Sequence, residues 1–119
     1  MHTKIMIVDD SLFARALLQA TLSHVSPDAV VFEASGADEA FGLIAREEFD
    51  AAIVDFHMPD MDGLTLAKKL KEAKPDLPIT LLTANVQREI REQADNLGIG
   101  FLNKPISEED AKAVLMGIA

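Results

Sequence analysis

The stretch AAIVDFHMPDMDG, residues 51–63, decides how the rest of the chain folds. Its first four residues are small or β-branched, which is typical of a strand buried on both faces of a parallel sheet. The strand ends on a single acid, Asp55, and the chain then turns into a loop. Ligands bind at the carboxyl ends of strands in open α/β sheets, because loops surround that edge. An acid at this point either begins a turn or belongs to a site.

The other segments alternate between short apolar runs and helical patterns. The apolar runs predict further strands over residues 4–8, 29–34, 79–82 and 99–102. Apolar residues at helical spacing predict helices over residues 11–25, 37–44, 62–73, 86–97 and 107–118. Short connections between alternating strands and helices require right-handed crossovers and a parallel sheet. We therefore predict an α/β fold, a doubly wound, five-stranded parallel sheet of the flavodoxin-like type with helices on both faces, in one domain over residues 1–119.

The fourth helical pattern has an apolar side and a recognisable end. Val86, Ile90, Ala94 and Leu97 are expected to face the core, because they recur at helical spacing. Gly98 suits the end of this helix, since glycine readily takes the left-handed conformation found there.

Composition excludes several classes of protein. The 119 residues include no cysteine, and hence no disulfide framework or thiolate metal site. No apolar run approaches the roughly 18 residues of a membrane-spanning helix, and the amino-terminal residues do not form a signal peptide, so we expect a cytoplasmic protein that does not bind membranes. A formal net charge of −9 leaves no basic stripe for phosphates, so direct binding of nucleic acid is not expected.

Polar residues stand where four of the predicted strands end. Asp9 and Asp10 follow the first strand, Asp55 the third, Thr83 the fourth and Lys104 the fifth. The carboxyl ends of parallel strands share one edge of the sheet, and neighbouring strands lie about 4.8 Å apart. The sequence therefore predicts that these side chains lie within reach of one small ion and its ligands.

Three carboxylates at one edge repel one another, so they must take up a proton, pair with Lys104 or hold a cation. Oxygen ligands without His or Cys favour Mg²⁺, with Mn²⁺ as a substitute. Asp9, Asp10, Asp55 and Lys104 together carry a formal charge of −2, which one Mg²⁺ brings to zero. A neutral pocket admits an anionic phosphoryl group, whereas the metal-free pocket repels it.

Phosphoryl chemistry follows from this set of residues. Asp55 can attack a phosphoryl group in line and form an acyl phosphate, while Lys104 and Mg²⁺ stabilise the phosphoryl oxygens and Thr83 donates a hydrogen bond. No residue of the motif is a general base aimed at water. We therefore expect the protein to catalyse its own phosphorylation and slow dephosphorylation, without turning over external substrates.

The ordered motifs IMIVDDS, IVDFHMPDMDG, LLTAN and FLNKP resemble the receiver domain of bacterial two-component response regulators, in particular the stand-alone chemotaxis type. The resemblance implies that Asp55 is the phosphoacceptor and that Thr83 and Lys104 sense the phosphoryl group. It also implies that Asp10 and Asp55 bind Mg²⁺ directly. Asp9 would act mainly through water, and the backbone carbonyl of His57 would complete the metal shell.

The same resemblance assigns a switch and its partners. Phe101 occupies the position of the family's switch aromatic, where Tyr is common; a core residue is the less favoured alternative. Lys104 and Pro105 resemble the family's cis peptide bond. The donor would be a sensor histidine kinase or a phosphotransfer protein. The target would bind the face formed by residues 86–97, 99–102 and 107–118.

The resemblance also implies a tuning role for His57, a variable position two residues after the acceptor, and for Asn85 opposite it. His57 and Asn85 would control how fast water reaches the acyl phosphate, and His57 would add pH dependence near neutrality. A loop histidine that simply points to solvent is the alternative for His57.

Three alternatives are compatible with parts of this pattern. The domain could be excised from a longer response regulator or hybrid kinase, although the predicted last helix reaches the end of the chain and favours output through a surface. A Mg²⁺-dependent aspartyl-phosphate phosphatase of the haloacid dehalogenase type needs a second acid at position 57, where this chain has His57. A flavodoxin-type binding module needs a phosphate-cradling loop after the first strand, which the sequence DDS does not provide.

Overall fold

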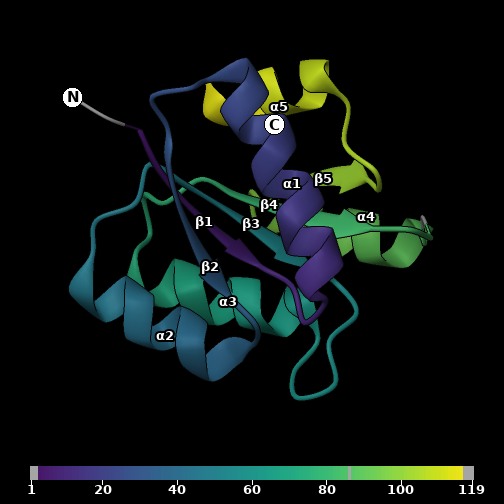
Figure 1. Ribbon diagram of the computed structural model, residues 1–119. Helices are drawn as coiled ribbons and strands as arrows, with labels where there is room; N and C mark the ends of the chain where they lie inside the picture. The colour runs from purple at the N-terminus through teal and green to yellow at the C-terminus, as the bar shows by residue number, and fades with distance from the viewer. Residues whose placement is uncertain (1–2, 86, 117–119) are drawn as a thin grey trace.

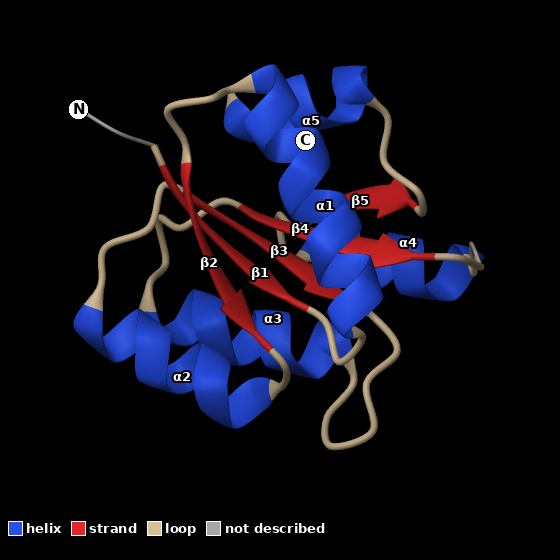
Figure 2. Ribbon diagram, viewed as in Figure 1, coloured by secondary structure: helices blue, strands red, loops and turns tan. Residues whose placement is uncertain are grey.

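The computed structural model describes residues 3–85 and 87–116, and strands alternate with helices throughout (Figures 1 and 2). Val86 and Ile118, which the sequence placed in helices, lie outside the described residues. The elements are β1 (Lys4–Val8), α1 (Leu12–Val25), β2 (Val30–Ala34), α2 (Ala37–Arg46), β3 (Ala51–Asp55), α3 (Gly63–Ala73), β4 (Ile79–Thr83), α4 (Arg88–Asn96), β5 (Gly100–Asn103) and α5 (Glu108–Leu115).

The five strands form one parallel sheet in the order β2-β1-β3-β4-β5. This confirms the predicted doubly wound α/β fold. The chain leaves β1 toward β2 on one side and later returns to β3 on the other, so the strand order reverses between β1 and β3. Such a switch point opens a crevice at the carboxyl ends of its two strands.

The helices cover both faces of the sheet, as Figure 1 shows. Side chains alternate across each strand, so every strand contributes to two cores. Met6, Val8 and Val54 pack toward α2, α3 and α4, whereas Ile5 and Ile53 pack toward α1 and α5. The first four residues of β3 are buried, as their uninterrupted apolar sequence predicted, and Asp55 at the end of the strand is buried as well, although an acid at a ligand-binding edge was expected to be exposed.

Some boundaries and exposures differ from the sequence prediction. β2 begins one residue later, and β5 is shifted by one residue because pairing with β4 runs from Gly100 to Asn103. Leu97, expected to face the core, is 40% exposed. α4 has already ended at Asn96, and Gly98 takes a φ of 70° in the turn that follows. The buried Ile99, whose N–H donates to the Ala94 carbonyl at 2.9 Å, closes the core in place of Leu97.

The loop after β3 returns to the end of the strand from which it leaves. The Gly63 N–H donates to the Phe56 carbonyl at 2.8 Å, and Asp62 caps α3 by accepting from the Thr65 N–H. A Cβ at position 63 would overlap the Asp55 carbonyl oxygen. Glycine at this position therefore lets α3 begin directly beside the acid that ends β3.

Candidate functional site

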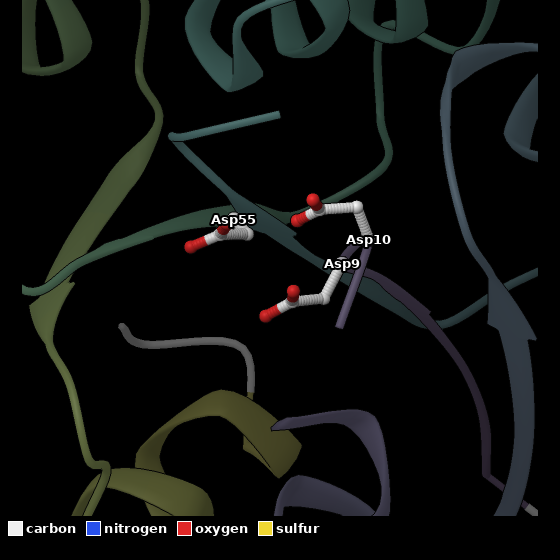
Figure 3. A group of neighbouring side chains, drawn as sticks. All are labelled: Asp9, Asp10 and Asp55. Atoms are coloured by element: carbon white, nitrogen blue, oxygen red, sulfur yellow. The ribbon is translucent and has the colours of Figure 1, made fainter. Parts of the chain in front are cut away.

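Three carboxylates meet at the switch point between β1 and β3. Asp9 and Asp10 follow β1, and Asp55 is the last residue of the neighbouring strand β3. One carboxylate oxygen from each lies within 4.8 Å of the others, and Figure 3 shows the three side chains around a common space. The sheet thus brings together the acids that the sequence placed at its edge.

Lys104 joins two of these acids. Its Nζ lies 2.8 Å from Asp9 Oδ2 and 2.7 Å from Asp55 Oδ1. The lysine follows β5, which lies two strands away from β3, so its long side chain reaches across the edge of the sheet. The Lys104 N–H donates to the Thr83 carbonyl at 2.9 Å, and the expected cis peptide bond between Lys104 and Pro105 is present.

The protonation of the pocket reflects both burial and charge. Burial raises the pKa of the Asp55 carboxyl above its usual range; the hydrogen bond from Lys104 opposes this rise, and the negative charge of Asp9 adds to it. Burial acts to lower the pKa of Lys104, but hydrogen bonds to Asp55 and Asp9 outweigh it and raise that pKa. Lys104 is therefore fully charged at neutral pH.

Asp9 and Asp10 differ in their surroundings although they are adjacent. Asp9 is 5% exposed, and its Oδ1 accepts from the Ser11 N–H at 2.9 Å. Asp10 is exposed, and its carboxylate accepts no hydrogen bond from residues 3–85 or 87–116. The carboxylate oxygens of Asp10 are thus free to bind a cation, whereas both oxygens of Asp9 already accept hydrogen bonds.

Arg15 supports this loop and was not singled out from the sequence. Its Nη1 donates to the Asp9 carbonyl at 2.7 Å, and its Nε pairs with Glu33 at 2.9 Å. A polar residue in the first turns of a helix gives no periodic signal, so only the packed structure shows this contact.

Thr83 lies at the end of β4, and its hydroxyl is hydrogen-bonded to the backbone of the following loop. The side chain is 1% exposed; its hydroxyl donates to the Asn85 carbonyl at 2.9 Å and accepts from the Asn85 N–H at 3.2 Å. The Thr83 hydroxyl is thus committed to the loop that leads into α4.

The remaining predicted residues lie around the pocket. His57 is exposed, and its ring meets Phe56 edge-on with the centroids 4.9 Å apart. The Asn85 side chain is also exposed. Phe101 is partly buried against the core that lies between the sheet and helices α2, α3 and α4. The Arg91 guanidinium lies 6.0 Å from the centre of its ring. Phe101 is therefore neither a fully buried core residue nor free in solvent.

The donor set fits a hard divalent cation. The candidate ligands from Asp9, Asp10 and Asp55 are all oxygens, and Asp10 faces solvent. Mg²⁺ prefers such oxygen ligands and keeps several waters when it binds through one or two carboxylates. A cation bound here would neutralise the part of the negative charge of the acids that Lys104 leaves.

A doubly wound sheet with an acidic pocket at its switch point defines a class of α/β proteins that bind ligands at the strand ends. The family model of the response regulator receiver domain matches residues 5–116. The chain therefore belongs to the response regulator receiver domain family. Receiver domains bind Mg²⁺ in this acidic pocket and take a phosphoryl group from histidine kinases or phosphotransfer proteins.

Relatives and solved structures agree with this family. The cyclic di-GMP phosphodiesterase response regulator RpfG of Xanthomonas campestris is 33% identical over 92% of this chain and 30% of its own length. The sensor protein EvgS of Escherichia coli K12 is 37% identical over 93% of this chain and 9% of its own length. The chemotaxis protein CheY4 of Vibrio cholerae, 27% identical, superimposes over 100% of both chains with a TM-score of 0.88.

The chain spans between 9% and 48% of the length of these and other curated relatives. Within the described part of the chain, every helix is too short or too polar to cross a membrane.

The raised pKa of Asp55 predicts a pH-dependent effect of its removal. Because the folded state holds this proton more tightly than the unfolded chain, the free energy of unfolding falls as the pH rises through the window between the two pKa values. In a chelating buffer we expect Asp55→Asn to unfold at a higher temperature than the wild type at pH 7. The difference should shrink as the pH falls toward 4.

Thermal unfolding followed by circular dichroism measures this difference. Asp76→Asn, an exposed acid at the opposite edge of the sheet, is the control and should not show the same trend. If the difference in unfolding temperature between Asp55→Asn and the wild type is the same at pH 7 and at pH 4, the conclusion that burial raises the pKa of Asp55 is wrong.

Proposed function

We propose that the chain is a phosphorylation-activated switch in a two-component phosphorelay, and that Asp55 is its phosphoacceptor. The observation that carries the proposal is the arrangement of Lys104, which pairs with Asp55 and Asp9 while Asp10 stays open to solvent. One carboxylate is thus held at the ligand-binding edge of the sheet beside a fixed positive charge. This is the arrangement that phosphoryl transfer to a carboxylate requires.

The metal would be held by oxygen atoms of the pocket. We assign Asp10 and Asp55 as direct ligands, Asp9 as a ligand mainly through water, and the His57 backbone carbonyl as a further ligand. When bound, Mg²⁺ supplies the positive charge that lets an anionic phosphoryl group approach three carboxylates. Mn²⁺ can take its place, since its ligand preferences are similar.

The transfer step involves few groups of the protein. A carboxylate oxygen of Asp55 attacks the phosphorus, and the bond from phosphorus to the donor breaks on the opposite side. The donor keeps the electron pair of that bond, as the imidazole of a phosphohistidine or as acetate when acetyl phosphate is used. Lys104 Nζ, already 2.7 Å from Asp55 Oδ1, would donate to an oxygen of the transferred group.

Hydrolysis of the acyl phosphate would be slow. None of the described side chains within hydrogen-bond distance of Asp55 is a general base, because its contact there is the charged Lys104. The phosphorylated state would then persist long enough to signal, and the domain would not turn over external substrates.

The direct test is phosphorylation by a small donor. Wild-type protein incubated with acetyl phosphate and Mg²⁺ should gain the mass of one phosphoryl group, and hydroxylamine should remove it. Asp55→Asn should not gain it, and a chelator should abolish the gain because the acidic pocket then repels the donor. A mass gain that is equal in Mg²⁺ and in chelator, measured by intact-mass spectrometry, would refute the proposal.

The switch would work through Thr83. Its hydroxyl is bonded to the Asn85 backbone, so it must leave that partner in order to donate to a phosphoryl oxygen on Asp55. The loop before α4 would rearrange, and the half-buried Phe101 on β5 could change its rotamer. Together these changes would alter the face formed by α4, β5 and α5, which we propose binds the downstream target.

Beryllofluoride, which mimics the phosphoryl group, tests this switch. Adding it with Mg²⁺ should shift the amide signals of residues 84–101, measured by two-dimensional NMR. Thr83→Ala should still bind beryllofluoride at Asp55 but lose most of the shifts beyond residue 84. Unchanged signals over this segment in the saturated wild type would exclude the proposed switch.

His57 and Asn85 are proposed to tune dephosphorylation. Both side chains are exposed near the acceptor loop, where they could control the approach of water. We expect His57→Ala to change the decay rate of the acyl phosphate, and to change it differently at pH 6 and pH 8 because imidazole ionises between them. The decay is measured by intact mass after removal of the donor. If His57→Ala and the wild type decay at the same rate at pH 6 and also at pH 8, His57 has no role in dephosphorylation and is simply a solvent-exposed loop residue.

The partners follow from the family. We propose a sensor histidine kinase or a phosphotransfer protein as donor, a cytoplasmic location, and no direct contact with nucleic acid or membrane. The same switch would serve as a stand-alone domain or as part of a longer regulator or hybrid kinase, since similar domains occur in relatives named as response regulators and as sensor proteins.

A further inference from the structure

Asp60 joins the loop after the acceptor to a helix from another part of the chain. This loop, residues 56–62, begins directly after Asp55. Asp60 Oδ2 accepts from the Ala37 N–H at the start of α2 at 3.0 Å, and its Oδ1 accepts from the Met61 N–H at 3.0 Å. The N-cap of α2 is Gly36, which has no side chain to bond the free N–H groups of the first turn. A carboxylate from a distant loop thus caps this helix.

The close approach of Asp60 depends on Gly36. A Cβ at position 36 would lie 2.9 Å from Asp60 Oδ2, closer than such atoms normally come. The backbone hydrogen bond from Ala37 lowers the pKa of the Asp60 carboxyl, which is therefore charged at neutral pH. A negative charge is also favoured at the amino end of a helix. The hydrogen bond between the Ala37 N–H and Asp60 therefore requires both the glycine at position 36 and the aspartate at position 60.

The loop on the other side of the metal pocket is tied to the same segment. The Asp9 N–H donates to the Ala34 carbonyl at 3.1 Å, and Arg15 connects the Asp9 carbonyl to Glu33. Residues 33–37, at the end of β2 and the start of α2, therefore contact both loops that carry the candidate metal ligands.

We propose that Asp60 is a positioning residue for the metal site: by binding the amino end of α2, it holds the loop of residues 56–62 beside the acidic pocket. The inference rests on the proposed function, because it concerns the same Mg²⁺ site. Asp60 would not touch the metal. Groups that orient metal ligands from outside commonly change metal affinity by about tenfold or more when removed.

The chain offers a matched control at the same helix end. Glu39 Oε1 accepts from the Ser35 N–H at 2.6 Å and from the Ser35 hydroxyl at 2.5 Å. Glu39 thus stabilises the entry into α2 with a carboxylate, but its hydrogen bonds go to Ser35 and not to the loop of residues 56–62. Its removal should cost stability without loosening the acceptor loop.

The experiment measures Mg²⁺ affinity by isothermal titration calorimetry together with thermal unfolding. Asp60→Ala should weaken Mg²⁺ binding about tenfold, and Asp60→Asn, which keeps an acceptor oxygen, should restore most of it. Gly36→Ala, which displaces an intact Asp60 by crowding it, should weaken binding in the same direction. Glu39→Ala should lower the unfolding temperature but leave the affinity close to the wild-type value.

A second readout separates positioning from chemistry. At saturating Mg²⁺, Asp60→Ala should be phosphorylated by acetyl phosphate at nearly the wild-type rate, since Asp60 touches none of the reacting atoms. Equal loss of Mg²⁺ affinity in Glu39→Ala and Asp60→Ala, or unchanged affinity in Asp60→Ala, would overturn the inference alone. A wild type that binds no Mg²⁺ and is not phosphorylated by acetyl phosphate would overturn the proposed function, and the inference with it.

Discussion

The contact between the Lys104 ammonium and the carboxylates of Asp9 and Asp55 is the constraint on which the rest of the site depends. The sheet forces like charges together at its edge, and burial makes their mutual repulsion stronger than it would be in water. One lysine neutralises part of this charge and leaves a pocket that is still negative. In the proposed function, this remaining charge would be neutralised by a cation, and an anionic group could then enter the pocket.

The backbone makes this arrangement possible. Asp9 and Asp55 face each other because the strand order reverses between β1 and β3, which leaves their carboxyl ends open. Gly63 lets the loop of residues 56–62 fold back onto the end of β3, where any larger residue would collide with the Asp55 carbonyl. The position of Asp55 is thus fixed by main-chain geometry, and its charge is controlled by the side chains around it.

The pocket is also connected to the part of the molecule that would transmit a signal. Lys104 binds the two acids with its side chain and the Thr83 carbonyl with its backbone. Thr83 in turn bonds through its hydroxyl to the loop before α4. A new group on Asp55 would therefore compete for both Lys104 and Thr83, and a short chain of contacts would carry the change to α4 and β5.

The sequence by itself determined the strands, the helices and the edge of the sheet at which the acids gather. Periodicity and turn residues are local, and parallel strands place their carboxyl ends on one side whatever their order. It also indicated Gly98 at the end of α4, whose role depends on neighbours a few residues away.

Tertiary structure alone decided which side chains meet. The contacts of Asp60 with α2 and of Arg15 with Glu33 join residues 23 and 18 positions apart in the chain. The Thr83 hydroxyl bonds to the Asn85 backbone rather than to the site, although its position at a strand end suggested otherwise. Leu97 is exposed because α4 ends one residue before it. These outcomes depend on competition among partners in three dimensions, which no local pattern of residues records.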